Sequence, residues 1–180
     1  YGDPAQLKEA VLSVVGQRDP DWRLIVIDDC YPKWDAEPWV TELGDSRIEF
    51  TRNRQNLGVS GSFNRSIDLA RSEYLTIMGC DDRLLPDYVG TVRAAIEKFE
   101  HPDFVQPGVR VIDQDGAPSY PLVDRVKTWV RPSVPAGGAL LAGEGVMTTL
   151  LRGDWAYFPS ICWRRDVLAK HRFSPDFEIT

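Results

Sequence analysis

Buried-strand patterns that alternate with helical patterns restrict the fold of this chain more than any other feature. Residues 24–27 form a wholly apolar run rich in β-branched side chains, and residues 74–78 form a second run typical of a buried strand. Strands without apolar–polar alternation are covered on both faces of a sheet. A helical pattern at 59–71 lies between the two runs. Strand, helix and strand in succession predict an α/β fold with a wound, mostly parallel, Rossmann-like sheet and flanking helices.

Caps and turn residues divide the rest of the chain. Asp3 before Pro4 predicts the start of a helix that presents Leu7 and Val11 on one face. Further elements are expected as a helix at 36–43, a strand at 47–51, a helix from Pro86, a strand at 160–163 and a short helix at 164–171. Residues 117–145 are rich in Pro and Gly, which predicts a functional or mobile loop.

Composition argues against several classes of function. The 180 residues carry 21 Lys and Arg against 27 Asp and Glu, a formal net charge of −6. This balance argues against a protein that grips nucleic-acid backbone or an anionic membrane. No apolar run approaches the roughly 18 residues of a membrane-spanning helix. Three Cys and two His without zinc-ligand spacing argue against a zinc site, and reduced thiols are typical of a cytoplasmic protein.

Paired acids follow both buried runs. Asp28 and Asp29 come directly after the first run, and Asp81 and Asp82 follow the second after two residues. Ligands bind outside the carboxyl ends of strands in an open parallel sheet. Acid pairs gathered there repel one another, and Mg²⁺ or Mn²⁺ would relieve the repulsion while keeping positions open for phosphates. On neighbouring parallel strands the two pairs predict a cation site, with caps and turns as the alternative for either pair alone.

The common phosphate-binding loops are missing from the sequence. It holds neither GxxxxGK[ST] nor GxGxxG. Phosphates would therefore be held by the cation, by Arg or Lys, and by helix N-termini. Asn56, Leu57 and Gly58 precede the predicted helix at 59–71 and suit that purpose, with a plain turn as the alternative.

An ordered series of short matches connects these features. It comprises Leu7, Ala10-Val11, Ser13-Val14, Gln17, residues 24–29, Asn56-Leu57-Gly58, Asn64, residues 70–75, residues 79–82 and residues 85–87. In this series the chain resembles family 2 glycosyltransferases of the GT-A fold, which transfer sugars from nucleotide diphosphates. A later segment with Pro159-Ser160, Arg164-Arg165, Leu168 and Phe173 resembles the acceptor side of the same family.

The resemblance implies a donor site. The residues expected to bind the nucleotide, by the resemblance or at the helix N-terminus, are Tyr1, Asp28, Asp29, Asn56, Gly58 and Asp81. Asp29 matches the acid that hydrogen-bonds the base, and Asp81 lies near the ribose or the cation. Asp82 matches the metal ligand of the Asp-x-Asp region, with Mn²⁺ or Mg²⁺ as the implied cofactor. Gly79 departs from the family, because many relatives carry the first Asp of that motif there.

The acceptor side is less well marked. Trp155 and Tyr157 are candidates to stack on an acceptor sugar, with packing in the core as the alternative. The family's catalytic carboxylate is expected near or beyond Thr180, so Asp176 and Glu178 are the candidates for the base within the chain.

The resemblance also organises the chain as a whole. Residues 1–105 would form the nucleotide-sugar-binding half, and residues 106–180 a smaller acceptor-side half of the same domain. The family's first strand is expected before Tyr1, and because the sequence starts without Met, we expect a chain truncated at both ends.

These expectations together predict an inverting glycosyltransferase. The donor would be a sugar on UDP, GDP or dTDP, and the acceptor a carbohydrate or lipid-linked hydroxyl. The enzyme would work in the cytoplasm or at the inner face of a membrane, with no transmembrane segment and no nucleic-acid partner. Two alternatives stay open: a sugar-1-phosphate nucleotidylyltransferase, and a non-catalytic nucleotide-binding module of the same fold.

Overall fold

The first helix and the first two strands form around a small apolar core. The computed structural model describes residues 2–113 and 116–174. Helix α1 (Pro4–Val15) begins at the predicted cap, where the Asp3 carboxylate accepts a hydrogen bond from the backbone N–H of Ala5 at 2.8 Å. Strand β1 (Leu24–Asp28) pairs in parallel with β2 (Ile48–Arg52), and helix α2 (Glu37–Glu42) lies between them in sequence. Buried Val11, Val26 and Val40 form the core of this layer.

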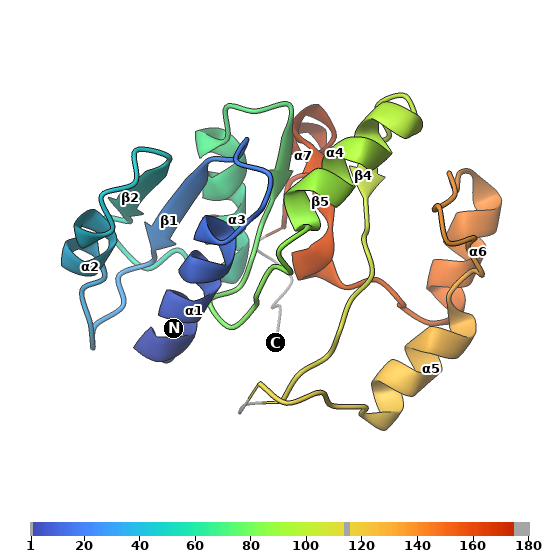
Figure 1. Ribbon diagram of the computed structural model, residues 1–180, viewed down its shortest axis with the longest axis horizontal. Coiled ribbons are helices and arrows are strands. Elements are labelled where there is room, and N and C mark those ends of the chain that lie inside the picture. The colour runs from blue at the N-terminus through green and yellow to red at the C-terminus, as the bar shows by residue number, and fades with distance from the viewer. Residues whose placement is uncertain (1, 114–115, 175–180) are drawn as a thin grey trace.

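A second, three-stranded sheet lies beside the first one (Figure 1). Its order is β3 (Tyr74–Thr76), β5 (Cys162–Arg164) and β4 (Phe104–Val105), and both pairings are antiparallel. Helices α3 (Gly58–Leu69), α4 (Tyr88–Lys98) and α7 (Arg165–Lys170) accompany it, with a 3₁₀ turn at Phe158–Ser160. Ile67, Ile77 and Leu168 form its buried core.

This topology corrects the expectation of one mostly parallel sheet. The chain is mixed α/β as predicted, but its described strands form one parallel pair and one antiparallel sheet. The two acid pairs therefore do not follow neighbouring parallel strands, since β1 pairs with β2 and β3 pairs with β5. An apolar run indicates that a strand is buried but carries no information about its partner. Here the partner of β3 comes from a segment far along the chain.

The predicted loop at 117–145 is wrong in its middle part. Helix α5 (Leu122–Val130) starts directly after Pro121, and α6 (Glu144–Arg152) follows. A proline next to the first turn favours a helix start, so Pro and Gly density alone was misleading here. The two helices lie together, away from both sheets (Figure 1), and neither has a buried residue. None of the helices in the described ranges is both long and apolar enough to cross a membrane.

Candidate donor site

Asp29 links the end of β1 to the start of α3. Its Oδ1 accepts hydrogen bonds from Asn53 Nδ2 at 2.6 Å and from the backbone N–H of Leu57 at 2.8 Å. Asn53 is buried, and its Nδ2 also donates to Ser62 Oγ on α3 at 3.3 Å. Both bonds to Asp29 use the same oxygen, and no described residue donates to Oδ2. The second carboxylate oxygen is therefore the one that can accept from a ligand.

The carboxylate of Asp28 makes contacts within the protein. The side chain is buried, and its Oδ1 accepts from the backbone N–H of Tyr31 at 2.8 Å. Its Oδ2 lies 3.5 Å from Nε of Arg52, its register partner on β2. This carboxylate therefore stabilises the turn after β1, and its contact with a nucleotide stays a prediction.

The start of α3 is already capped. The N–H of Leu57 donates to Asp29, and the N–H of Gly58 donates to Asn56 Oδ1 at 2.8 Å. Gly58 has a φ of +69°, a conformation that favours glycine. The structure thus brings Asp29, Asn56 and Gly58 together, but these two N–H groups already have acceptors. The nucleotide-binding roles of Asn56 and Gly58 stay predictions.

A tight acidic turn, residues 79–82, follows β3. A Cβ atom on Gly79 would lie 2.6 Å from Asp81 Oδ1 and 2.8 Å from Asp82 Oδ2. Both carboxylates therefore lie close to the same glycine, and a larger residue at 79 would force them to move.

The environment of Asp82 disfavours its charged form. Burial, together with the negative charge of Asp81, raises the pKa of the Asp82 carboxyl above its ordinary value of 3.8. The backbone N–H of Gly79, which donates to Asp82 Oδ2 at 2.9 Å, acts in the opposite direction. A cation at this turn would relieve both the burial of the charge and the repulsion between the two carboxylates.

The acidic turn suits a cation that also binds phosphates. In residues 2–113 and 116–174 there is no cluster of three or more His, Cys, Asp or Glu that could enclose a metal ion by itself. Mg²⁺ is commonly held by one or two carboxylates, with substrate phosphates and water completing the shell. The donor set of Asp81 and Asp82 fits that mode and not an all-protein cage. No hydrogen bond or ion pair between described residues joins the acidic turn to Asp28 or Asp29.

A half-buried polar side chain on α1 and a buried one in the turn after it hold the chain that follows the acidic turn. Ser13 Oγ accepts from the N–H of Leu84 at 3.0 Å. Gln17 Nε2 donates to the carbonyl of Leu85 at 2.8 Å, and Gln17 Oε1 accepts from the N–H of Val89 at 3.0 Å. The acidic turn is thereby fixed to α1 from its downstream side.

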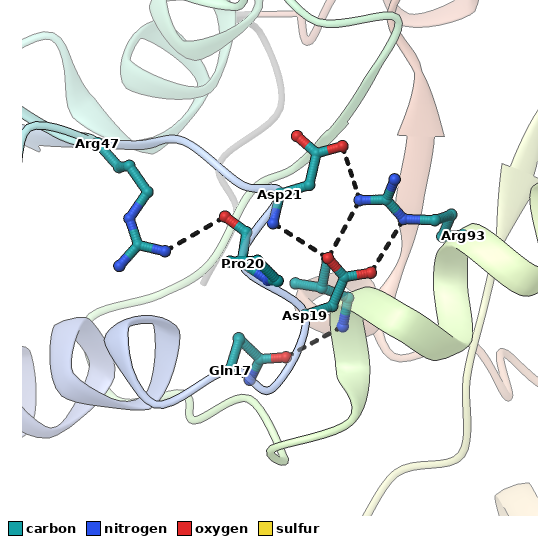
Figure 2. A network of polar contacts seen from close by, with 7 residues as sticks. Gln17, Asp19, Pro20, Asp21, Arg47 and Arg93 are labelled. Carbon is teal, nitrogen blue, oxygen red and sulfur yellow. Dashed lines mark hydrogen bonds and ion pairs between the residues drawn. The ribbon is translucent and has the colours of Figure 1, made fainter.

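A neighbouring network fixes the α1–β1 connection to α4 (Figure 2). Arg93 of α4 contacts Asp19 Oδ2 at 3.0 Å and Asp21 Oδ2 at 2.7 Å. Arg47 donates to the carbonyl of Pro20 at 3.2 Å and stacks over the Trp22 ring at 3.7 Å. The connection that follows Gln17 is therefore bound by Arg93 of α4 and by Arg47, which directly precedes β2.

Replacing Gln17 by Ala should destabilise the fold. The change removes two hydrogen bonds, one to the Leu85 carbonyl and one from the Val89 N–H, and at about 0.5–1.5 kcal/mol for each the loss should be about 1–3 kcal/mol. Urea denaturation measures the loss. Gln55→Ala, the same substitution at an exposed position, is the control and should change the free energy of unfolding by less than about 0.5 kcal/mol. Equal effects of both substitutions would contradict the role given to Gln17.

The predicted acceptor aromatics are engaged in packing. Trp155 is 6% exposed, and its Nε1 donates to Thr149 Oγ1 at 3.2 Å. The Tyr157 hydroxyl donates to Asp124 Oδ1 at 2.7 Å, and the Lys127 ammonium lies 4.5 Å from the ring centroid. These contacts favour the packing alternative for Trp155, and stacking on a sugar by either ring stays a prediction.

Three of the predicted site residues, Tyr1, Asp176 and Glu178, lie outside the described residues. The chain just before the two acids is tied to α3. Asn64 Nδ2 donates to the Phe173 carbonyl at 2.9 Å, and the Phe173 N–H donates back to Asn64 Oδ1 at 3.0 Å. An ion pair between Arg172 and Asp68 adds to this connection.

Comparison with known proteins decides the family. The profile of Glycosyl transferase family 2 matches residues 1–147. The chain belongs to this family. The resemblance inferred from the sequence is thereby confirmed.

Two curated relatives illustrate the extent of the match. WcaA of Escherichia coli (strain K12), named for glycosyl transfer in colanic acid biosynthesis, is 37% identical over 79 residues, or 43% of this chain and 28% of that protein. A glycosyltransferase of Methanocaldococcus jannaschii is 31% identical over 119 residues, or 64% of this chain and 41% of that protein. This family 2 chain therefore spans less than half the length of either relative.

Solved structures support the fold. The crystal structure of S. aureus TarS 1–349 matches with a TM-score of 0.68 at 14% identity, and the match covers 97% of this chain and 48% of that one. TarS in complex with UDP-GlcNAc matches with a TM-score of 0.66 at 16% identity, over 93% and 44% of the two chains. At this identity the likeness establishes a shared mixed α/β fold of the GT-A type.

Two polar residues of this family 2 domain were missed as site residues. Asn53 directly follows β2, so the strand-end argument that selected Asp28 and Asp29 could have found it. Gln17 belongs to the matched series, but its position just after α1 gave no sign that its amide reaches the chain after the acidic turn. Only the tertiary contacts reveal that role.

Proposed function

We propose that this domain is an inverting glycosyltransferase that moves a sugar from a nucleotide diphosphate to an acceptor hydroxyl. The observation that carries the proposal is the acidic turn, where two adjacent carboxylates, one of them half-buried, converge on a glycine in a family 2 domain. A bound cation would favour the ionised form of Asp82, which burial and the neighbouring charge of Asp81 disfavour.

The geometry supports the following roles on the donor side. Asp82 and Asp81 would hold a Mn²⁺ or Mg²⁺ ion, which would supply charge neutralisation for the departing diphosphate. Asp29 accepts from the nucleotide base through Oδ2, since its Oδ1 is occupied by Asn53 and Leu57. Asp28 keeps the turn after β1 in place. The first half of the chain, residues 1–105, thus binds the donor.

The acceptor side supplies the base. Inversion needs a carboxylate that removes the proton from the acceptor hydroxyl, in line with the anomeric carbon. Asp176 and Glu178 are the candidates, and the bonds between Asn64 and Phe173 support this, because they tie the preceding segment to the helix that begins beside Asp29. Residues 106–180 form the acceptor half, and we assign the reaction to the cytoplasm or the inner face of a membrane.

UDP-GlcNAc is the first donor to test, because TarS, which shares the fold, was solved with it. Release of UDP with Mn²⁺ present would be measured against the same reaction with EDTA, and against GDP- and dTDP-sugars. Loss of a general base costs about 10²–10⁴-fold in rate, so Asp176→Asn or Glu178→Gln should show such a fall. Cation-dependent nucleotide binding without release from any donor would favour the non-catalytic module instead.

A further inference from the structure

A small pocket lies on the acceptor side, apart from the donor site. It has a volume of about 60 Å³ and is enclosed by the chain after β4, by α5 and by the segment after α6. Gln106, Lys127, Arg131, Trp155 and Tyr157 contribute to its lining. A water-sized sphere needs roughly 10–15 Å³, so the pocket has room for a few waters or one small oxyanion.

Two cationic side chains line this pocket with little to neutralise them. Lys127 lies in the last turn of α5 and Arg131 directly follows the helix, and no ion pair joins either of them to an acid within the described ranges. Lys127 Nζ donates to the Ala156 carbonyl at 3.2 Å and keeps further donors. The Arg131 guanidinium makes no hydrogen bond to any described residue. Asp124, an acid on the same helix, already accepts a hydrogen bond from the Tyr157 hydroxyl.

A buried amide adds a second observation. Gln106 Oε1 is buried and has no hydrogen-bond partner among the described residues. A buried acceptor without a donor costs free energy, so a rotation of the Gln106 amide that brings Oε1 to a ligand hydroxyl would be favoured. The amide nitrogen of the same side chain can donate to an anion. The pocket thus combines donors for an oxyanion with an acceptor for a hydroxyl.

Aromatic packing connects this pocket to the donor half. Tyr157 is followed by Phe158, whose ring stacks on Phe63 of α3 with centroids 5.0 Å apart. Helix α3 begins beside Asp29. The pocket is therefore joined to the helix that begins beside Asp29 through Tyr157, its neighbour Phe158 and the ring of Phe63.

We propose that this pocket binds an oxyanion, a phosphate or a carboxylate, carried by the acceptor sugar. The oxyanion lies between Lys127 and Arg131, and a hydroxyl of the same acceptor donates to Gln106. The acceptor role rests on the proposed glycosyl transfer, whereas the anion site can be tested without it.

Inorganic phosphate is the first probe, titrated without Mn²⁺ and followed by NMR at the Trp155 indole N–H and the Gln106 side-chain amide. We expect saturable shifts at these groups, and about tenfold weaker binding in Arg131→Gln and Lys127→Gln through the loss of a charge-assisted bond. Arg125→Gln, on the same helix but outside the pocket lining, is the matched control and should bind like the wild type. No shifts at these groups, or an equal loss in the control, would overturn the proposal.

Three sugars then identify the source of the oxyanion. Glucose 6-phosphate, glucuronate and neutral glucose are titrated in the same way, and the tighter of the two anions assigns phosphate or carboxylate. Glucose that binds as well as either anion would overturn the proposal. UDP binding with Mn²⁺ is measured separately, because Arg131→Gln should leave the affinity for UDP unchanged. If UDP binds and phosphate does not, the anion pocket is refuted. If phosphate binds and UDP does not, the proposed function is refuted.

Discussion

Replacing Asp82 by Asn is expected to abolish cation-dependent binding of a nucleoside diphosphate while leaving the fold intact. Asn keeps an oxygen that can accept from the Gly79 N–H, the bond seen at 2.9 Å. It removes the negative charge that the cation requires. Replacing a residue that hydrogen-bonds a metal ligand typically lowers metal affinity about 10–100-fold. Loss of the ligand itself should therefore lower cation-dependent binding by about 100-fold or more. Calorimetry with UDP and Mn²⁺ measures the change.

The same substitution should not lower stability when no cation is present. The pKa of Asp82 is raised in the fold, mainly by burial, so the native state binds this proton more tightly than the unfolded state does. The ionised carboxylate therefore costs stability once the pH exceeds its folded pKa, and the cost disappears as the pH falls below 3.8, the ordinary value. In EDTA at pH 7, Asp82→Asn should be at least as stable as the wild type in urea.

Asp87→Asn is the matched control for Asp82. Asp87 is exposed, pairs with Arg18 at 2.7 Å, and lies on the same connection to α4. UDP affinity with Mn²⁺ should be unchanged in this variant. Unchanged affinity in Asp82→Asn, or a clear loss of stability at pH 7 without cation, would refute the assignment of Asp82.

Replacing Asp29 by Asn should weaken nucleotide binding about 10- to 100-fold, the value of one hydrogen bond to a charged group. Asn keeps an Oδ1 for the donors of Asn53 and Leu57, so the turn is preserved and only the oxygen offered to the base changes. Asp29→Ala removes both protein bonds as well, and should lower the free energy of unfolding by about 1–3 kcal/mol.

Pyrophosphate separates the base contact from the phosphate contacts. With Mn²⁺, its affinity should be the same for the wild type and for Asp29→Asn, because it has no base. An equal loss for UDP and for pyrophosphate would place Asp29 near the phosphates and contradict the assignment.

Local sequence signals predicted the elements of the first hundred or so residues well. The cap at Asp3, the apolar run of β1 and the amphipathic pattern of α3 each depend on residues next to one another, and each element was found near its predicted bounds. The acid pairs after β1 and β3 were likewise visible as strand ends.

Long-range pairings were not predictable in this way. The sequence does not indicate that β3 pairs with β5 in an antiparallel manner, because the two strands are far apart in the chain and each is short. Helix α5 was missed for a different reason. Its apolar side chains Leu122, Val126 and Trp129 recur at helical spacing, although Leu122 and Trp129 are 71% and 77% exposed, so the helical signal was present and the surrounding Pro and Gly residues outweighed it.

The hydrogen bonds of the candidate site could not be predicted from the sequence. Asn53 and Gln17 act through side-chain contacts with segments distant in the chain, at Asp29 and at Leu85. The crowding of two carboxylates around Gly79 likewise depends on the conformation of one turn. Residue type and spacing select candidates, whereas the fold decides which oxygen atoms are left for a ligand.

The most direct test of the account is nucleotide binding by the unaltered protein with and without a cation. Thermal unfolding would be followed with UDP, GDP and dTDP, each with Mn²⁺ and each with EDTA. The account predicts that at least one nucleotide raises the unfolding temperature with Mn²⁺ and that EDTA removes the shift. No shift with any nucleotide, or a shift of the same size in EDTA, would contradict it.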